Sequence, residues 1–351
     1  LEIEEDDGSR RIIVTDETWR TTTQGSITAA GIYDGETCDF RKEQEGWETG
    51  GYDDGAWKRA AAFDRDDRLL VWQRNEPIAI TRELAPVGRT EPRPGVHVFD
   101  FGQNLVGWCR LRVSGVAGQP VTLRHAEMLN DDGTLYTANL RGAPQVDRCI
   151  PRTGAVFEYE PRFTYHGFRF VEITGVTRPP PLAAIRARVL HSAAPEVGSF
   201  ACSDPSLEQL MRNILWTQRA NLMSSPNDCP QRDERFGWMG DIQAFAQTAI
   251  FQMDLAAFGT KWLQDVRDDQ AADGRFPDFA PHPGDPNRAF SGAPAWADAG
   301  VIVPWRLYEN YGDRRVLDEH FDAARRWVDS VARANPDLLW SERRLNDYND
   351  W

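Results

Sequence analysis

The sequence has no long apolar run and no excess of positive charge. Nowhere in its 351 residues does it offer the eighteen or so consecutive apolar residues that a membrane-crossing helix needs. Its 54 acidic residues outnumber its 40 lysines and arginines, which gives a formal charge of −14. Negative charge repels phosphate backbones and anionic lipid surfaces. We therefore expect neither nucleic acid nor a membrane among its partners.

Paired cysteines, clustered histidines and glycosylation signals are absent as well. The five cysteines are odd in number and widely spaced, with no CxxC pair, which argues against a disulfide framework and against a zinc site. The six histidines form no HxxxH or HxH cluster, and the DDG run at 131–133 predicts a hairpin turn rather than a calcium loop. We expect no metal and no other cofactor.

The compartment is only weakly indicated. Unpaired cysteines, no Asn-x-Ser/Thr acceptor and no signal peptide favour a cytoplasmic protein. A secreted or periplasmic setting stays open, because the chain starts at Leu1 rather than Met and is expected to be a piece of a longer protein. The oligomeric state is left open too.

The hydrophobic pattern changes once along the chain. From Arg11 to about His191, short runs rich in β-branched and aromatic residues, VHVFDF and GWCRLRVSG among them, alternate with Gly, Pro, Asn and Asp turns, which predicts separate short strands in a β-sandwich region. After Ser203 the apolar residues recur at helical spacing. The length allows more than one core. The expected domains are a partial β-sandwich domain over 1–80, a second β-sandwich domain over 81–198, and a helical domain over 199–351.

Five helices are expected in the third part, most of them joined by short loops as antiparallel hairpins. Their predicted ranges are 203–223, 242–253, 255–269, 295–311 and 314–333.

The densest chemistry lies in the stretch DCPQRDERFGWMGD, residues 228 to 241, which we call the acidic motif. It holds four acids, two arginines and a tryptophan, on a segment that Pro230, Gly237 and Gly240 make a loop. Cleavage of a glycosidic bond needs one carboxylic acid that protonates the leaving oxygen and one carboxylate that activates water or attacks. The motif therefore indicates an acidic cleft suited to carbohydrate, with Trp238 as a flat apolar face for a sugar.

A structural alternative explains the same residues without function. The acids and arginines could form a salt-bridge network at the start of a helix, with Asp241 as the N-cap of the run 242–253.

The motif and its surroundings resemble a known family. The run DCPQRDERFGWMGDIQAFAQTA closely resembles the signature of the bacterial α-L-rhamnosidases of glycoside hydrolase family 78, where it opens the active site of an (α/α)6 barrel. Upstream, FDFGQNLVGWCRLRVSG, LRHAEMLNDDGTLY and FTYHGFRFVEITG resemble the β-sandwich domains that precede that barrel. The resemblance implies a multidomain fold, with an N-terminal β-sandwich region and an all-α (α/α)6 toroid that is incomplete in this chain.

The resemblance also implies roles for individual residues. It makes Glu234 the general acid, Asp228 and Asp241 ligands of rhamnose hydroxyls, Arg232 a supporting pocket residue and Trp238 a wall of the pocket. As the acid, Glu234 is expected to have a raised pKa, through contact with Trp238 and repulsion from Asp228 or Asp241.

Two downstream segments resemble barrel segments that line the sugar pocket. One is AWADAG around Trp296, and the other is the closing NDW with Asp350 and Trp351, which departs at Asn349 from the family's G-D-W.

The implied activity is hydrolysis of terminal α-L-rhamnose from rhamnose-containing glycosides or oligosaccharides, with inversion. The family's base is a Glu late in the barrel, so we expect it beyond Trp351 and expect this chain alone to be inactive. Two other readings stay open: another enzyme on the same toroid, such as a different glycosidase, a phosphorylase or a lyase, and a non-catalytic carbohydrate-binding protein.

The remaining candidate residues are expected to have structural roles rather than functional ones. Four tryptophans in helical stripes are expected to pack in the core, and His282 is expected to be an exposed loop residue rather than a substrate contact. The four are Trp216, Trp262, Trp305 and Trp327.

Overall fold

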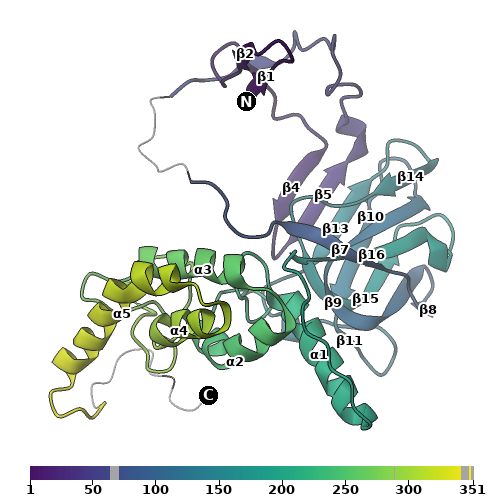
Figure 1. The fold of residues 1–351 in the computed structure, drawn as a ribbon. Coiled ribbons are helices and arrows are strands. Elements are labelled where there is room, and N and C mark those ends of the chain that lie inside the picture. Colours follow the sequence, from purple (N-terminus) through teal and green to yellow (C-terminus); the bar gives the residue numbers. More distant parts are fainter. Residues whose placement is uncertain (64–70, 288, 341–347, 349–351) are drawn as a thin grey trace.

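The chain divides into a sheet-rich part followed by a helical part. In the computed structural model, residues 1–63, 71–287, 289–340 and 348 are described. Figure 1 shows the large sheet on one side, a small pair of strands near the N-terminus apart from it, helices α2 to α5 on the other side, and α1 beneath the sheet. Among the described residues, no helix has the length and apolarity to cross a membrane.

The sheet-rich part is built on one ten-stranded sheet in the order β4-β5-β13-β10-β15-β9-β16-β7, with β8 and β14 also paired to β9. All its pairings are antiparallel except β5 with β13. Its strands are β4 (Ile27–Gly31), β5 (Gly35–Asp39), β7 (Ile78–Leu84), β8 (Gly88–Arg93), β9 (Val96–Ser114), β10 (Val121–Ala126), β13 (Val146–Ile150), β14 (Val156–Tyr159), β15 (His166–Thr174) and β16 (Ile185–Ser192).

Strand β9 makes this sheet fold over into two layers. Its first half, around Val98 to Asp100, lies between β8 and β15, whereas its second half, from Leu111 onward, lies against β14 and the start of β16. One strand thus belongs to both layers, and side chains of both, such as Phe99 and Leu111, meet in a single core. The two runs VHVFDF and GWCRLRVSG, expected as separate strands, are this one strand.

The sheet crosses the expected boundary at residue 80. Strands β4, β5 and the start of β7 lie within 1–80, yet β5 pairs with β13 and β7 with β16. The other strands of this region form two small two-stranded sheets, β1 (Glu2–Glu4) with β2 (Arg10–Ile12) and β3 (Arg20–Thr21) with β6 (Lys58–Arg59). The division at 80 and 198 stays a prediction.

Short elements connect the strands. A two-stranded ribbon of β11 (Met128–Leu129) and β12 (Leu135–Tyr136) closes through Gly133 at φ 78°, which confirms the hairpin expected from DDG. Three 3-10 turns are η1 (Phe40–Lys42), η2 (Ala138–Leu140) and η3 (Leu182–Ala184).

The helices confirm the expected ranges to within a few residues. They are α1 (Pro205–Asn221), α2 (Met239–Gln252), α3 (Ala256–Asp268), α4 (Ala299–Tyr311) and α5 (Arg314–Ala334). Asp204 and Asp313 cap α1 and α5 by accepting a backbone N–H, and Gly312 ends α4 in the left-handed conformation. The described residues therefore contain a helical domain beside the sheets.

Helix α1 joins the two cores. Leu215 packs against the helical core, while Trp216 packs against the sandwich core. Two of the four tryptophans assigned to packing, Trp262 and Trp327, are fully buried in the helical core as expected. The assignment was wrong for Trp305, which is 49 % exposed, because helical spacing does not tell which face of a helix is covered.

Candidate active site

The acidic motif is a loop that leads from the end of α1 into the first turn of α2. Two glycines allow the loop to pack closely. A Cβ at Gly237 would lie 2.2 Å from the carbonyl oxygen of Ala280, and one at Gly240 would lie 2.8 Å from the Trp296 indole. Only glycine permits both approaches.

The sandwich holds this loop through the buried guanidinium of Arg235. It donates hydrogen bonds to the carbonyl oxygens of Ile32 and, at 2.8 Å, Tyr165, and its carbon lies 4.7 Å from the centre of the Tyr165 ring. The Tyr33 hydroxyl donates to the carbonyl oxygen of Glu234 at 2.7 Å. Burial lowers the pKa of Arg235, and carbonyls and ring faces replace the carboxylate that a buried arginine usually pairs with. Arg235 therefore anchors the loop rather than tuning its acids.

Glu234 lies among hydrogen-bond donors. Its Oε2 accepts from Arg141 Nη2 at 2.9 Å and from Arg232 Nε at 3.0 Å, and its Oε1 accepts from the Trp238 indole at 3.0 Å. Burial alone would raise the pKa of Glu234, but the adjacent Asp228, the charge of Arg232 and the other donors together lower it. The expectation of a raised pKa at Glu234 was wrong, because the sequence shows the arginines but not which acid they face.

Asp228 carries the raised pKa instead. Its carboxyl lies within 4.8 Å of those of Glu234 and the Cys229 thiol. Burial raises the pKa of Asp228 to about 6, and the charges of Glu234 and Asp241 act in the same direction, against the hydrogen bond that Cys229 donates at 2.8 Å. Below about pH 6 the two acids Asp228 and Glu234 thus hold one proton between them, and in this arrangement the proton lies on Asp228.

Asp241 lies in the first turn of α2, with its side chain exposed to solvent. Partial desolvation of its carboxyl and the charge of Glu234 nevertheless raise the pKa of Asp241. The residue before α2 is Trp238, with no side-chain cap, so the cap role that the structural alternative gave to Asp241 was wrong. The salt bridges of that alternative are present, since Glu234 pairs with Arg232 and with Arg141.

Aromatic rings form a wall beside these acids. Trp238 meets Phe279 edge-on at 4.8 Å, and both Trp238 and Trp296 lie next to Tyr348, at 5.7 and 4.5 Å between ring centroids. His282 stacks on Phe279 and is partly buried, so the expectation of an exposed loop residue was wrong.

Several members of this site were not found from the sequence. Tyr348 donates to Asp278 at 3.1 Å, and burial raises the pKa of Asp278 to about 6. Arg141 comes from the sandwich, 92 residues before its partner Asp233. Neither lies in a recognisable local pattern. The expected pocket residues Asp350 and Trp351 lie outside the described residues.

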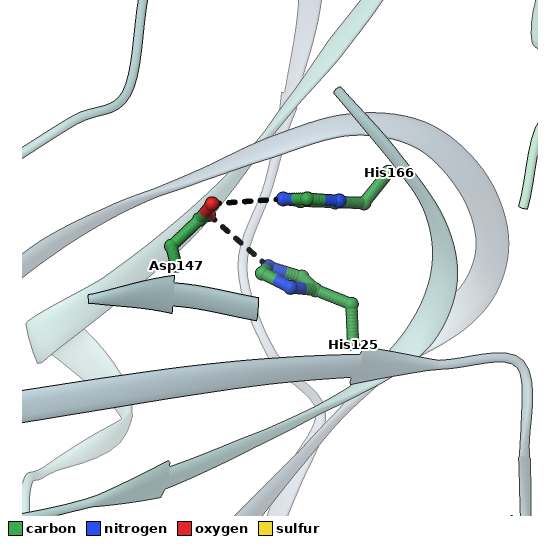
Figure 2. Close-up of side chains that lie close together, drawn as sticks. All are labelled: His125, Asp147 and His166. Carbon is green, nitrogen blue, oxygen red and sulfur yellow. Dashed lines mark hydrogen bonds and ion pairs between the residues drawn. The ribbon is translucent and has the colours of Figure 1, made fainter. Parts of the chain in front are cut away.

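A second cluster of titratable groups lies in the sandwich, and we call it the sandwich triad (Figure 2): His125, Asp147 and His166. All three side chains are fully buried. His166 Nε2 lies 3.0 Å from Asp147 Oδ1, which also accepts the backbone N–H of Glu36 at 2.9 Å. The two imidazole rings stack 4.1 Å apart at 24°. Both rings turn a nitrogen toward the Asp147 carboxyl, at 3.0 Å from His166 and 3.9 Å from His125 (Figure 2).

The group of Asp228, Cys229 and Glu234 also brings possible ligands together. Arg141 and Arg232 already neutralise Glu234 there, which leaves little attraction for a cation.

A solvent-accessible pair of carboxyls that share a proton, flanked by arginines and by an indole wall on a helical domain, is typical of an enzyme that acts on carbohydrate.

Comparison with known proteins defines the class further. Three family models match the chain: the alpha-L-rhamnosidase N-terminal domain over residues 1–82, the bacterial alpha-L-rhamnosidase concanavalin-like domain over 90–191, and the bacterial alpha-L-rhamnosidase 6 hairpin glycosidase domain over 195–351. The chain belongs to the bacterial alpha-L-rhamnosidase family of glycoside hydrolases.

Individual relatives agree with this assignment. An alpha-L-rhamnosidase of Streptomyces avermitilis is 46 % identical over all of this chain and 34 % of its own length, and one of Formosa agariphila is 36 % identical over all of this chain and 38 % of its own. The crystal structure of the Streptomyces avermitilis alpha-L-rhamnosidase complexed with L-rhamnose superposes with a TM-score of 0.94, at 46 % identity, over 100 % of this chain and 33 % of that one. The alpha-L-rhamnosidase from Dictyoglumus thermophilum does so with a TM-score of 0.94, at 41 % identity, over 100 % and 39 %. The chain therefore spans between a third and two fifths of these relatives' length.

Proposed function

We propose that the full-length protein hydrolyses terminal non-reducing α-L-rhamnose residues from α-L-rhamnosides, with inversion and with Glu234 as the general acid. Support comes from the relatives named above, one of them crystallised with L-rhamnose. The observation that carries the proposal is the Asp228–Glu234 pair, two partly buried carboxyls whose pKa values shift in opposite directions beside the Trp238 indole.

The lowered pKa of Glu234 fits this role once a sugar is considered. Sugar hydroxyls that donate hydrogen bonds to Asp228 favour its ionised form, because hydrogen bonds to a charged acid lower its pKa. The shared proton then moves from Asp228 to Glu234, which passes it to the leaving oxygen. Substrate binding thus puts Glu234 into its protonated form, the form that acts as general acid.

We place the base outside this chain. An inverting enzyme needs its two carboxyls roughly 6.5–9.5 Å apart to leave room for water, and the oxygens of Asp228 and Glu234 lie within 4.8 Å. Asp228 is thus too close to Glu234 to act from the opposite face of a sugar. The relatives are about three times as long as this chain, and we propose that α1 to α5 form the first part of an (α/α)6 toroid whose later part supplies a glutamate.

Asp228, Asp241 and Arg232 are proposed to hold rhamnose hydroxyls, with Trp238 and Trp296 as walls; Asp350 and Trp351 are proposed to complete the pocket. The cytoplasmic setting also stays a proposal, supported by cysteines that are all unpaired in the described residues.

An assay of the full-length protein on an aryl α-L-rhamnoside, with and without phosphate, tests the function. Hydrolysis is expected in phosphate-free buffer, with the inverted anomer as the first product seen by proton NMR. A strict need for phosphate would instead identify a phosphorylase. Binding of rhamnose without turnover would identify a carbohydrate-binding protein.

A further inference from the structure

The sandwich reaches the acidic motif through one unusual residue, Arg141. It directly follows the 3-10 turn η2 and adopts φ 53° and ψ −113°, in the left-handed range that a residue with a side chain rarely adopts. Such a backbone persists only where surrounding contacts hold it, and these outliers concentrate at functional sites.

Those contacts lead to two neighbouring acids of the motif. Arg141 Nε donates to Asp233 Oδ1 at 2.7 Å, and its Nη2 donates to Glu234 Oε2 at 2.9 Å. The next residue, Gly142, donates its backbone N–H to Asp233 Oδ2 at 3.0 Å, and a Cβ there would lie 2.6 Å from the same oxygen. The Arg-Gly pair is therefore shaped to receive Asp233 and to place one guanidinium nitrogen on Glu234.

We propose that Arg141 is a positioning residue through which the sandwich fixes the orientation of Glu234 and decides which member of the Asp228–Glu234 pair holds the proton. This inference rests on the proposed function and deepens it. It makes the sandwich part of the catalytic apparatus, rather than only a neighbour of the helical domain.

The surroundings of Glu234 show what Arg141 adds. The motif itself supplies Arg232 and the Trp238 indole as donors, Asp228 and Asp233 as acids, and the Cys229 thiol. Helix α2 contributes the charge of Asp241, and the sandwich contributes the Tyr33 hydroxyl at the backbone.

Arg141 adds to these groups a positive charge that comes from the sandwich rather than from the motif. It shares Oε2 with Arg232, which leaves Oε1 for Trp238 and holds the carboxyl in one orientation. Asp233 accepts from Nε, which lies beside Nη2 on the same edge of the guanidinium, and this second bond prevents Arg141 from following Glu234 if Glu234 turns away.

Arg169 offers a matched control. It lies on the same sandwich. It forms a bidentate ion pair with Asp100, with both bonds 2.8 Å long, and no residue of the acidic motif takes part in this pair. Its side chain and that of Asp100 are 42 % and 29 % exposed, against 50 % and 34 % for Arg141 and Asp233. Arg169→Gln thus removes an equivalent surface pair without touching Glu234.

The test compares Arg141→Gln, Arg141→Lys and Arg169→Gln in the full-length enzyme. We expect Arg141→Gln to lose about tenfold in kcat on alkyl rhamnosides, and less on activated aryl rhamnosides, because the acid is misplaced. Loss of the positive charge should also raise the pKa of Glu234, so the alkaline limb of kcat/KM should move to higher pH. Arg141→Lys should keep the limb nearer its original place, and Arg169→Gln should match the wild type in both readouts.

The inference is overturned if Arg141→Gln behaves like Arg169→Gln, or if it slows both substrate classes equally with an unmoved alkaline limb. The contact itself is tested without activity by the melting temperatures of Arg141→Gln, Glu234→Gln and the double variant. The losses should be non-additive, whereas those of Arg169→Gln and Glu234→Gln should add. A wild-type enzyme that releases no rhamnose would sink the proposed function, while the melting temperatures would still decide on the contact.

Discussion

The sandwich triad and the Asp228–Glu234 pair both bring titratable groups together, but they differ in what surrounds them. The triad is fully buried, and Asp147 accepts bonds from His166 and from a backbone N–H, so its pKa is lowered while burial lowers the pKa of His125 to about 3. The pair is only partly buried, and its two acids have pKa values that move in opposite directions. A closed cluster with fixed protons stabilises a fold, whereas an accessible pair with one mobile proton can do chemistry.

The largest expected effect is a loss of kcat when the Asp228–Glu234 pair is changed. Glu234→Gln in the full-length enzyme should lose ~10²–10⁴ in kcat on rhamnosides with poor leaving groups, the usual contribution of a general acid. Activated aryl rhamnosides need little protonation and should suffer less. Steady-state kinetics on both substrate classes measure this difference.

Asp228→Asn is the companion variant. As a proposed sugar ligand, Asp228 should affect the binding of both substrate classes alike. Because Glu234 is also proposed to take its proton from Asp228, the loss of kcat should be larger on poor leaving groups. A Glu234→Gln enzyme that loses the same factor on both classes would contradict the role of Glu234 as acid.

A change in the triad should lower the stability of the protein and leave its activity almost unchanged. Asp147→Ala leaves His166 and the N–H of Glu36 unpaired in a closed interior, and we expect the free energy of unfolding to fall by about 3–5 kcal/mol. Urea denaturation measures the loss, and the activity per folded molecule should stay near that of the wild type. Arg169→Gln, which removes a partly exposed pair with Asp100, should cost about 0.2–1 kcal/mol. An Asp147→Ala enzyme that folds normally but has lost activity would overturn the structural role of the triad.

Asp278 combines the two cases, since it is fully buried like the triad and has a pKa raised to about 6. Because the folded state holds the Asp278 proton more tightly than the unfolded state does, the free energy of unfolding is highest below the unfolded pKa. It falls as the pH rises from there through about 6. Between pH 4 and 7 we expect Asp278 to reduce the free energy of unfolding by about 2–3 kcal/mol. Asp278→Asn should remove that part of the pH dependence in urea denaturation at a series of pH values. If the free energy of unfolding depends on pH in the same way in Asp278→Asn and in the wild type, the pKa of Asp278 is not raised by folding.

The smallest effect is expected where the loop meets the indole wall. Gly240→Ala places a Cβ about 2.8 Å from the Trp296 ring, and overpacking of this kind costs ~1–3 kcal/mol. We expect a higher KM for aryl rhamnoside together with a modest loss of stability. Gly88→Ala is the control, because nothing lies within 4 Å of a Cβ at that position. Equal KM values for the two variants would show that Trp296 does not line the pocket.

Local pattern predicted much of the helical part and of the motif. All five helices follow from spacing and caps, and the motif identified Asp228, Glu234 and Trp238 within one loop. Strand pairing was not predictable in the same way, since alternation shows which side of a strand is buried but not its neighbour, and β9 was expected as two strands. Arg141 was missed because the contact that gives it meaning is 92 residues distant. The opposite pKa shifts of Asp228 and Glu234 depend on which carboxyl faces the arginines, and only three-dimensional positions decide that.

The parallel pairing of β5 with β13 has a consequence for how the chain emerges during synthesis. Glu36 and Asp147, joined by a hydrogen bond beside this pairing, are 111 residues apart, and β7 finds its neighbour only when β16 appears. At about 5–20 residues per second, β5 would wait roughly 5–20 s on the ribosome with an unpaired edge. Long-range pairing of this kind also folds slowly. The nascent chain therefore carries unpaired strand edges, which are prone to aggregation, until Ser192 has been made.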